Sequence, residues 1–104
     1  MTDLEMTRLC SQAMKLIVQY TTGETVWRFP ETLNYYDPLF DDAQAMALLK
    51  EMELSVRAEL NVKTSEKYWS AMYPGIPLFW TKNTYLNRAI VECVAKMQAA
   101  KVTA

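Results

Sequence analysis

The sequence predicts an α+β fold, in which three helices pack with a largely antiparallel sheet of three to five strands. Three observations favour this class. Apolar residues recur at spacings of three and four in three separate segments, which is the period of a helix. β-Branched and aromatic residues dominate several segments between them, as is typical of strands. The connections between the later strands are short enough for hairpins, so we expect antiparallel pairing and the order α-β(β)-α-β-β-β-α.

The N-terminal part predicts one helix followed by short strands. Thr2 and Glu5 have the spacing of a capping box, and the apolar pattern that follows predicts a helix of about 17 residues. Gly23 is the expected terminator of this helix, because glycine adopts the left-handed conformation at helix ends without strain. Residues 25–29 then predict a short strand, and residues 32–35 a second, weaker one.

The most regular strand pattern covers residues 53–62, where apolar and polar residues alternate strictly. One face of this strand should therefore pack on a core, and the other should meet water or a partner. A polar turn separates it from a second strand at residues 67–73, which completes a hairpin. Residues 73–76 fit a type II turn, and a third strand is expected at residues 78–81.

Two further helices flank these strands. A helix of about three turns is predicted from Ala43 to Met52. The C-terminal helix has a continuous apolar stripe from Leu86 to Met97, and Asn83 is a suitable N-cap for it.

Composition limits the function classes. The chain of 104 residues is expected to form a single domain, residues 1–104. Its net charge of −1 argues against a dedicated nucleic-acid binder, which usually carries a basic balance. The sequence has no histidine, which removes histidine-based nucleophile activation and histidine-ligated metals. There is also no glycine-rich phosphate loop and no nucleophile motif, so we expect no enzyme activity and no cofactor.

The two cysteines, Cys10 and Cys93, fall within apolar helical patterns, so we expect buried thiols that behave as small hydrophobic groups. The first residues do not have the pattern of a signal peptide, and no apolar run reaches the length of a membrane span. We therefore expect a cytoplasmic protein that does not bind membranes.

The segment LNYYDPLFDDAQAMALL, residues 33–49, contains three aspartates close together. The favoured interpretation is structural: Asp37 makes a turn, Asp41 caps the following helix, and Asp42 lies in its first turn. A metal-dependent enzyme at these carboxylates is the third alternative, although the sequence lacks the pattern of an EF-hand. Exposed acids and aromatics could instead meet a partner protein. The candidate partner-binding residues are Tyr35, Tyr36, Asp37, Phe40, Asp41 and Asp42.

A second group of aromatic residues is interleaved with lysines. Most of these aromatics are expected to fill the core between the sheet and the helices, and others to lie at a protein interface. The alternative is that they stack on the bases of single-stranded nucleic acid or bind a nucleotide. The candidate residues for this alternative function are Lys63, Lys67, Tyr68, Trp69 and Lys82.

Two segments carry a resemblance to a known group of proteins. NYYDPLFDDAQAMALLKEMELSV (34–56) and NRAIVECVAKM (87–97) resemble parts of small accessory proteins of tailed phages and prophages, of the ABA-sandwich-like type. That group usually has asparagine before the proline and threonine or serine before the aspartate pair, where this sequence has Asp37 and Phe40. The capping role therefore passes to Asp41, and Phe40 could act as a hydrophobic staple.

The resemblance implies an α/β sandwich, a phage origin and no catalytic residues. It suggests a small non-enzymatic accessory protein that acts in the cytoplasm of the bacterial host. Such a protein would bind and inhibit a host protein, and the sharpest form of this expectation is a counter-defence inhibitor of an immune complex, similar to an anti-CRISPR. A homodimer is compatible with this function and with both alternatives.

Overall fold

The computed structural model describes residues 1–21, 26–74 and 76–103. They form three helices and two antiparallel sheets, which confirms the predicted class and element order. The elements are α1 (Asp3–Ala13), β1 (Gln19–Thr21), β2 (Val26–Arg28), α2 (Asp42–Glu51), β3 (Ser55–Asn61), β4 (Glu66–Tyr73), β5 (Ile76–Asn83) and α3 (Leu86–Thr103).

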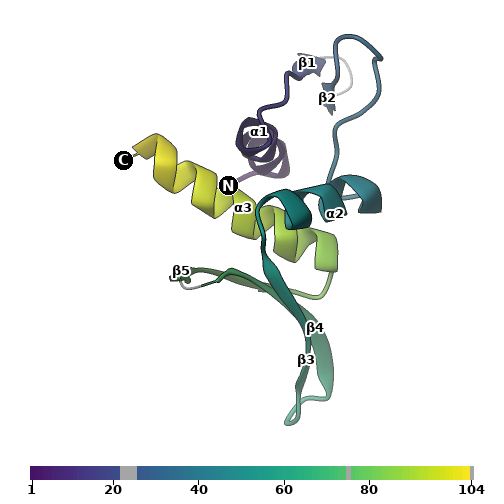
Figure 1. Cartoon of the computed structure of the whole chain (residues 1–104). Coiled ribbons are helices and arrows are strands. Elements are labelled where there is room, and N and C mark those ends of the chain that lie inside the picture. The colour runs from purple at the N-terminus through teal and green to yellow at the C-terminus, as the bar shows by residue number, and fades with distance from the viewer. Residues whose placement is uncertain (22–25, 75, 104) are drawn as a thin grey trace.

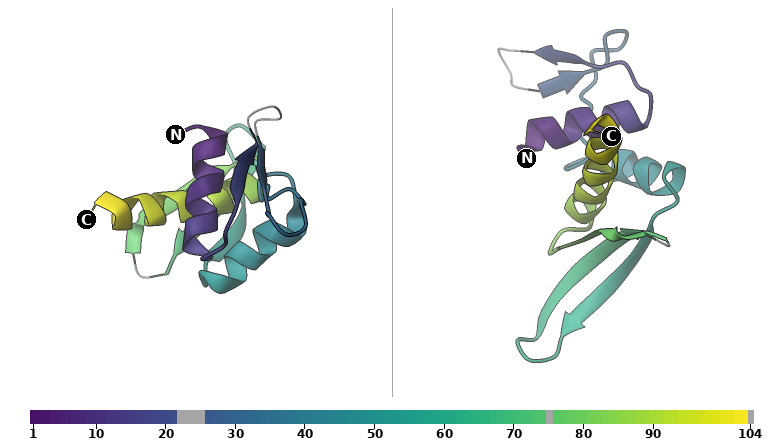
Figure 2. Two further views of the ribbon diagram at one scale, coloured as in Figure 1. Left: turned by 90° about the horizontal axis from the view of Figure 1, so that it is seen from above. Right: turned by 90° about the vertical axis from the view of Figure 1, so that its left-hand side faces the viewer.

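Helix α3 is the centre of the arrangement. It crosses the molecule between the three-stranded sheet β3-β4-β5 on one side and helices α1 and α2 on the other (Figure 1). The two-stranded sheet β1-β2 lies beyond α1, at the far end from the larger sheet (Figure 2). All three helices therefore lie on the same side of the sheet β3-β4-β5, and the hairpin of β3 and β4 extends away from them.

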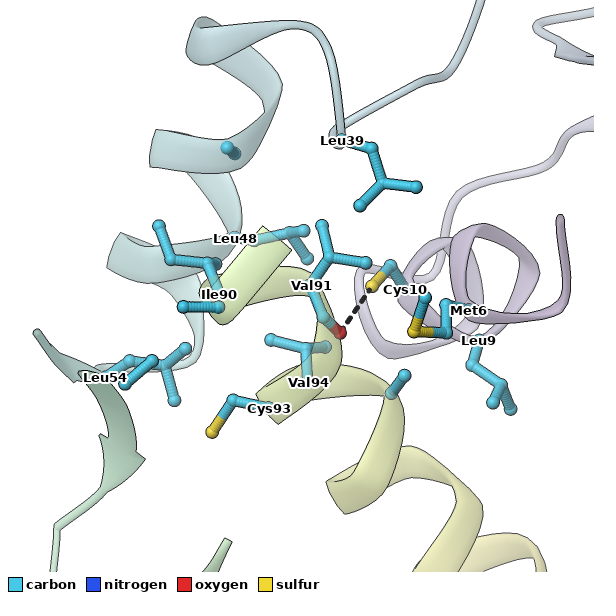
Figure 3. Close-up of a cluster of buried hydrophobic side chains, with 14 of the residues drawn as sticks. Met6, Leu9, Cys10, Leu39, Leu48, Leu54, Ile90, Val91, Cys93 and Val94 are labelled. Carbon is cyan, nitrogen blue, oxygen red and sulfur yellow. Dashed lines mark hydrogen bonds between the residues drawn. The ribbon is translucent and has the colours of Figure 1, made fainter. Parts of the chain in front are cut away.

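The core forms where these helices meet. The middle of α3 is apolar on nearly every side, and residues Ala89 to Val91 and Cys93 to Ala95 are completely buried. Cys10 from α1 and Leu48 from α2 pack around them, and the Cys10 thiol donates a hydrogen bond of 3.6 Å to the carbonyl oxygen of Val91 (Figure 3). An apolar surface all round is what a helix surrounded by other elements requires.

Both cysteines are free and buried, as expected from the sequence. The Cys93 thiol donates to the carbonyl oxygen of Phe79 in β5, at 3.2 Å. Burial raises the pKa of Cys10 to about 12 and that of Cys93 to about 11. Both thiols are therefore protonated near neutral pH and belong to the packing of the core.

The first helix is shorter than predicted. Thr2 caps it by accepting a hydrogen bond of 3.1 Å from the backbone N–H of Glu5, as expected, but α1 ends at Ala13. Lys15 adopts φ 57°, and the N–H of Leu16 donates to the carbonyl oxygen of Ser11 at 2.9 Å. This is a Schellman ending with lysine where glycine is usual, so no glycine marks the end of the helix in the sequence. The predicted terminator, Gly23, lies outside the described residues.

The chain after α1 forms β1, whereas the apolar pattern predicts that the helix continues into this segment. The strand predicted at residues 25–29 is present as β2, and Trp27 ties it to α1 by donating from Nε1 to the carbonyl oxygen of Leu4 at 3.0 Å. The weaker strand expected at residues 32–35 is reduced to a single bridge between Arg28 and Tyr35.

Later elements agree with the predictions more closely. Helix α2 and the hairpin β3-β4 lie where the periodicity placed them. The expected type II turn depends on Gly75, which lies outside the described residues. Asn83 is not the N-cap of the last helix: it lies at the end of β5, and its Oδ1 accepts a hydrogen bond of 3.0 Å from the N–H of Tyr85, one residue before α3 begins.

The two faces of the large sheet are different. Ala58 of β3 pairs with Trp69 of β4, and their side chains share the face toward α3, where Thr81 Oγ1 donates to the carbonyl oxygen of Ala89 at 2.6 Å. The opposite face carries Arg57, Glu59, Tyr68, Met72, Trp80 and Lys82. No described helix covers the second face, where Trp80 is 43% exposed although Ser70 is buried.

No helix among the described residues combines the length and the apolar character that crossing a bilayer requires.

Candidate functional site

The acidic turn before α2 is built mainly by local hydrogen bonds. Asp41 caps α2 by accepting a hydrogen bond of 3.0 Å from the N–H of Gln44, which confirms the predicted cap. The Gln44 side chain accepts from the N–H of Asp37 at 2.6 Å and donates to the carbonyl oxygen of Tyr35 at 2.9 Å. Asp42 lies in the first turn, as predicted, and accepts a hydrogen bond of 2.8 Å from Asn87 of α3. The turn and the N-terminal ends of α2 and α3 are therefore held together.

These bonds separate the three aspartates. Burial raises the pKa of Asp37, while a hydrogen bond with the Leu39 backbone opposes the shift. Asp41 and Asp42 are turned toward different donors, on α2 and α3. Within residues 1–21, 26–74 and 76–103, no three acidic or cysteine side chains come close enough to hold a metal ion. The metal-dependent alternative at Asp37, Asp41 and Asp42 therefore finds no ligand set in this part of the structure.

The two neighbouring tyrosines lie in different environments. Tyr36 is 3% exposed, and its ring packs edge-on against Phe29 with a centroid distance of 5.6 Å. Burial raises its pKa, and its hydroxyl has no hydrogen-bond partner among the described residues. Tyr35 is exposed, and the Arg28 guanidinium lies 4.3 Å from its ring centroid. Tyr36 is thus a core residue, and its predicted place on a partner-binding surface is wrong.

An apolar groove lies where the two helix ends meet the hairpin. A hollow of about 880 Å³ opens between the start of α2, the start of α3 and β4. A second hollow of about 380 Å³ continues from it along β3 and β4. The two share Trp69 and Thr84, so they form one continuous depression. We call it the Trp69 groove. Its apolar and aromatic lining consists of Leu39, Phe40, Met46, Ala58, Leu60, Tyr68, Trp69, Tyr85 and Leu86.

Large apolar side chains at this groove are exposed to solvent. Phe40 is 78% exposed and Tyr85 is 71% exposed. Phe40 precedes the cap of α2 in the position of a hydrophobic staple, but the residue it would meet, Ala45, offers only a methyl group and is already buried. The staple therefore does not form, and the ring points to solvent. Tyr85 is held at the start of α3 by the turn that Asn83 makes.

The charged groups around the groove are mostly acidic or already paired. Arg88 forms a two-pronged ion pair with Asp3 of α1, with both distances 3.0 Å, and this hydrogen bonding lowers the pKa of Asp3. Asp41 and Asp42 remain exposed beside Phe40. An apolar lining beside exposed carboxylates favours a partner surface that combines an apolar side chain with a lysine or arginine.

The residues proposed for nucleic-acid binding are split between the two faces of the sheet. Lys67 and Trp69 lie on the face of the groove, whereas Tyr68 and Lys82 lie on the open face, where the Lys82 ammonium is 5.7 Å from the Tyr68 ring centroid. Lys63 lies in the turn that joins β3 to β4. Lys67, Tyr68 and Trp69 nevertheless line one hollow together, whereas Lys63 and Lys82 are not part of its lining.

The structure brings together two sets of residues that the sequence left apart. Phe40 and Asp42 came from the acidic turn and Trp69 from the lysine-rich group, yet all three line the same hollow. Met46 and Leu60 were not predicted as site residues, because both fall at core spacings in the sequence; Met46 does pack against the core, whereas Leu60 is 54% exposed. Tyr85 was not predicted as a site residue either, although its position between a strand and a helix cap was a signal for it.

Comparison with protein-family models, with curated proteins and with solved structures gives no match to this chain.

Proposed function

We propose that this protein is a non-enzymatic binding protein that captures a partner protein in the Trp69 groove and inhibits it by occupying the surface it covers. The observation that carries the proposal is the groove itself, with Phe40 and Tyr85 largely exposed at its edge. Removing a phenylalanine side chain from water on binding contributes about 2 kcal/mol. Two such rings around Trp69 are a suitable centre for a protein interface, where aromatic residues dominate the binding energy.

The partner is expected to be basic near its contact. Asp41 and Asp42 stand beside Phe40 and carry two negative charges into the rim of the groove. A partner segment with an apolar side chain for the groove and a neighbouring lysine or arginine would satisfy both features. Because rim charges mainly affect the rate of association, binding should slow as salt concentration rises.

In its sharper form, we propose that the protein is encoded by a phage, acts in the cytoplasm of a bacterial host and is directed against a host immune complex. The support for this form is the resemblance of residues 34–56 and 87–97 to small accessory proteins of tailed phages. The groove supports capture of a protein, and the resemblance supports the choice of partner.

The test of capture is a pull-down from bacterial lysate with matched variants. A Phe40→Ala, Tyr85→Ala double variant should lose the captured protein, because two exposed rings leave the groove. Ile17→Ala is the control, since Ile17 is as exposed as Phe40, at 78%, but lies outside the groove. Equal capture by all three proteins, or no capture by the unsubstituted protein, would contradict the proposal.

The test of the sharper form uses living cells. Expression in a host whose immune system restricts a phage should raise the number of plaques, and the groove variant should not. If the unsubstituted protein binds its partner but leaves restriction unchanged, the immune target is wrong while capture through the groove still holds.

A further inference from the structure

Strand β3 is an open edge of the large sheet. Among the described strands it pairs only with β4, so the backbone groups on its other side have no strand beside them. Most of its residues are exposed, including Arg57, Ala58 and Leu60. An open edge of seven residues is a template for pairing with another strand, and proteins usually protect such edges.

The sequence of this edge is complementary to itself. Residues 54–62 read LSVRAELNV, and Ala58 is at their centre. If two copies run antiparallel with Ala58 facing Ala58, Arg57 of each copy faces Glu59 of the other. In the same register, Val56 faces Leu60 and Ser55 faces Asn61. Apolar residues therefore meet apolar residues, and opposite charges meet twice.

We propose that the occupant of this edge is a second copy of the chain, joined through β3 across a two-fold axis at Ala58, so that two three-stranded sheets become one six-stranded antiparallel sheet. This contact is isologous, so it closes with two copies and does not continue into a fibre. This contact shares Ala58, Glu59 and Leu60 with the hollow along β3 and β4, whereas Phe40 and Tyr85 line the other hollow of the Trp69 groove.

Charge selects this register over its neighbours. Arg57 and Glu59 already lie 3.3 Å apart within one strand, and the second copy surrounds each with an additional opposite charge. Moving the axis to residue 57 would place Arg57 against Arg57, and moving it to residue 59 would place Glu59 against Glu59. A shift of the pairing by a single residue would bring the apolar face of one copy against the polar face of the other.

The pairing also explains the exposed end of the hairpin. Leu60 is 54% exposed on the apolar face of β3, and Val62, in the turn that follows the strand, is 84% exposed. Because the strands run antiparallel, Leu60 of one copy lies beside Val56 of the other, close to the point where α2 of that copy ends. The two-fold axis is perpendicular to the sheet, so the helices of both copies lie on the same side of the six-stranded sheet.

Cysteine cross-linking tests the register directly. In Ala58→Cys the two new thiols face each other at the axis, with Cα atoms about 4.5–5.5 Å apart, which suits a disulfide. Mild oxidation should give a covalent dimer of twice the 12.0 kDa chain mass. The native Cys10 and Cys93 are buried and should not compete.

Two matched variants are the controls. Val56→Cys alone should not cross-link, because residue 56 of the two copies would be roughly 13 Å apart along the strands. Leu60→Cys alone should fail for the same reason, but a mixture of the two variants should form a mixed dimer. Cross-linking of either variant by itself, in place of Ala58→Cys, would overturn the register.

Charge reversal tests the association without a covalent bond. Arg57→Glu or Glu59→Arg should each weaken dimerisation roughly tenfold, because two attractive pairs become repulsive. The double reversal should restore it to within about threefold. Sedimentation equilibrium gives these constants. A monomeric mass for the unsubstituted protein at every concentration, or a double reversal as weak as the single ones, would overturn the proposal. Phe40→Ala should leave the constant unchanged, which separates this contact from the hollow that Phe40 lines.

Discussion

The body of the molecule and the far end of its hairpin both have apolar residues at regular spacings, but these residues are buried in the body and exposed in the hairpin. In the body, the apolar faces of α1, α2 and α3 meet, and residues such as Leu48 and Ile90 are completely buried (Figure 3). In the hairpin, the apolar face of β3 continues past the reach of the helices, and Leu60 and Val62 remain in solvent. Alternation determines which side chains share a face, but the neighbouring elements determine whether that face is covered.

The largest expected difference between the two regions is in the free energy of unfolding when one apolar side chain is truncated in each. Leu48→Ala should lower the free energy of unfolding by about 2–5 kcal/mol, because it removes buried methyl groups and leaves a cavity. Val62→Ala should change it by about 0.5 kcal/mol or less, because the side chain is exposed. Urea unfolding of dilute protein measures both values. Equal losses would show that the hairpin end is packed as tightly as the body.

A second prediction concerns pH, and it separates the regions because both cysteines belong to the body. In the unfolded chain a thiol has its ordinary pKa near 9.0, whereas folding raises the pKa of Cys10 to about 12 and of Cys93 to about 11. Above pH 9 the folded state therefore keeps protons that the unfolded state releases, so stability is full below that pH and falls as pH rises toward the folded values.

The expected slope is roughly 1.4 kcal/mol per pH unit for each thiol ionised only in the unfolded chain. Unfolding by urea at a series of pH values measures it, with Cys10→Ala as the comparison. The variant should show the shallower fall. An identical slope in both proteins would mean that Cys10 does not contribute.

The smallest predicted effect is the relief of backbone strain, and it should be the same at both ends of the hairpin. Glu53, at the start of the hairpin, has φ 54°, and Ser65, at its turn, has φ 60°. Each pays the steric cost of a left-handed conformation, so Glu53→Gly and Ser65→Gly should each raise the free energy of unfolding by about 0.5 kcal/mol. Ala47→Gly, inside α2, is the control and should lower it by about 1 kcal/mol. Thermal unfolding of the three variants would show whether backbone strain is independent of packing.

Features that depend on neighbouring residues were predictable from the sequence. The caps at Thr2 and Asp41, helix α2 and the alternation of β3 each arise from contacts within a few residues. The end of α1 was not predictable, because Lys15 adopts a conformation that the sequence signal assigns to glycine. The exposure of Tyr35 and the burial of Tyr36 were not predictable either, because adjacent residues in an extended turn point in opposite directions and their surroundings decide which one is buried.

The groove was only partly predictable for a related reason. Phe40 and Trp69 were each singled out, but their proximity depends on how α2 and the hairpin are placed around α3. No local pattern encodes that placement. Leu60 has the spacing of a core residue, but the hairpin extends beyond the helices and leaves this side chain 54% exposed.

The positions of the three tryptophans make each region of the molecule separately observable. Trp27 is bonded to α1, Trp69 lines the groove and Trp80 lies on the open face of the sheet. Their fluorescence therefore arises from three distinct surroundings, and a protein that retains only one of them would report on one region alone. Emission from Trp69 would follow the filling of the groove, while emission from Trp27 would follow the docking of the N-terminal strands on the helices.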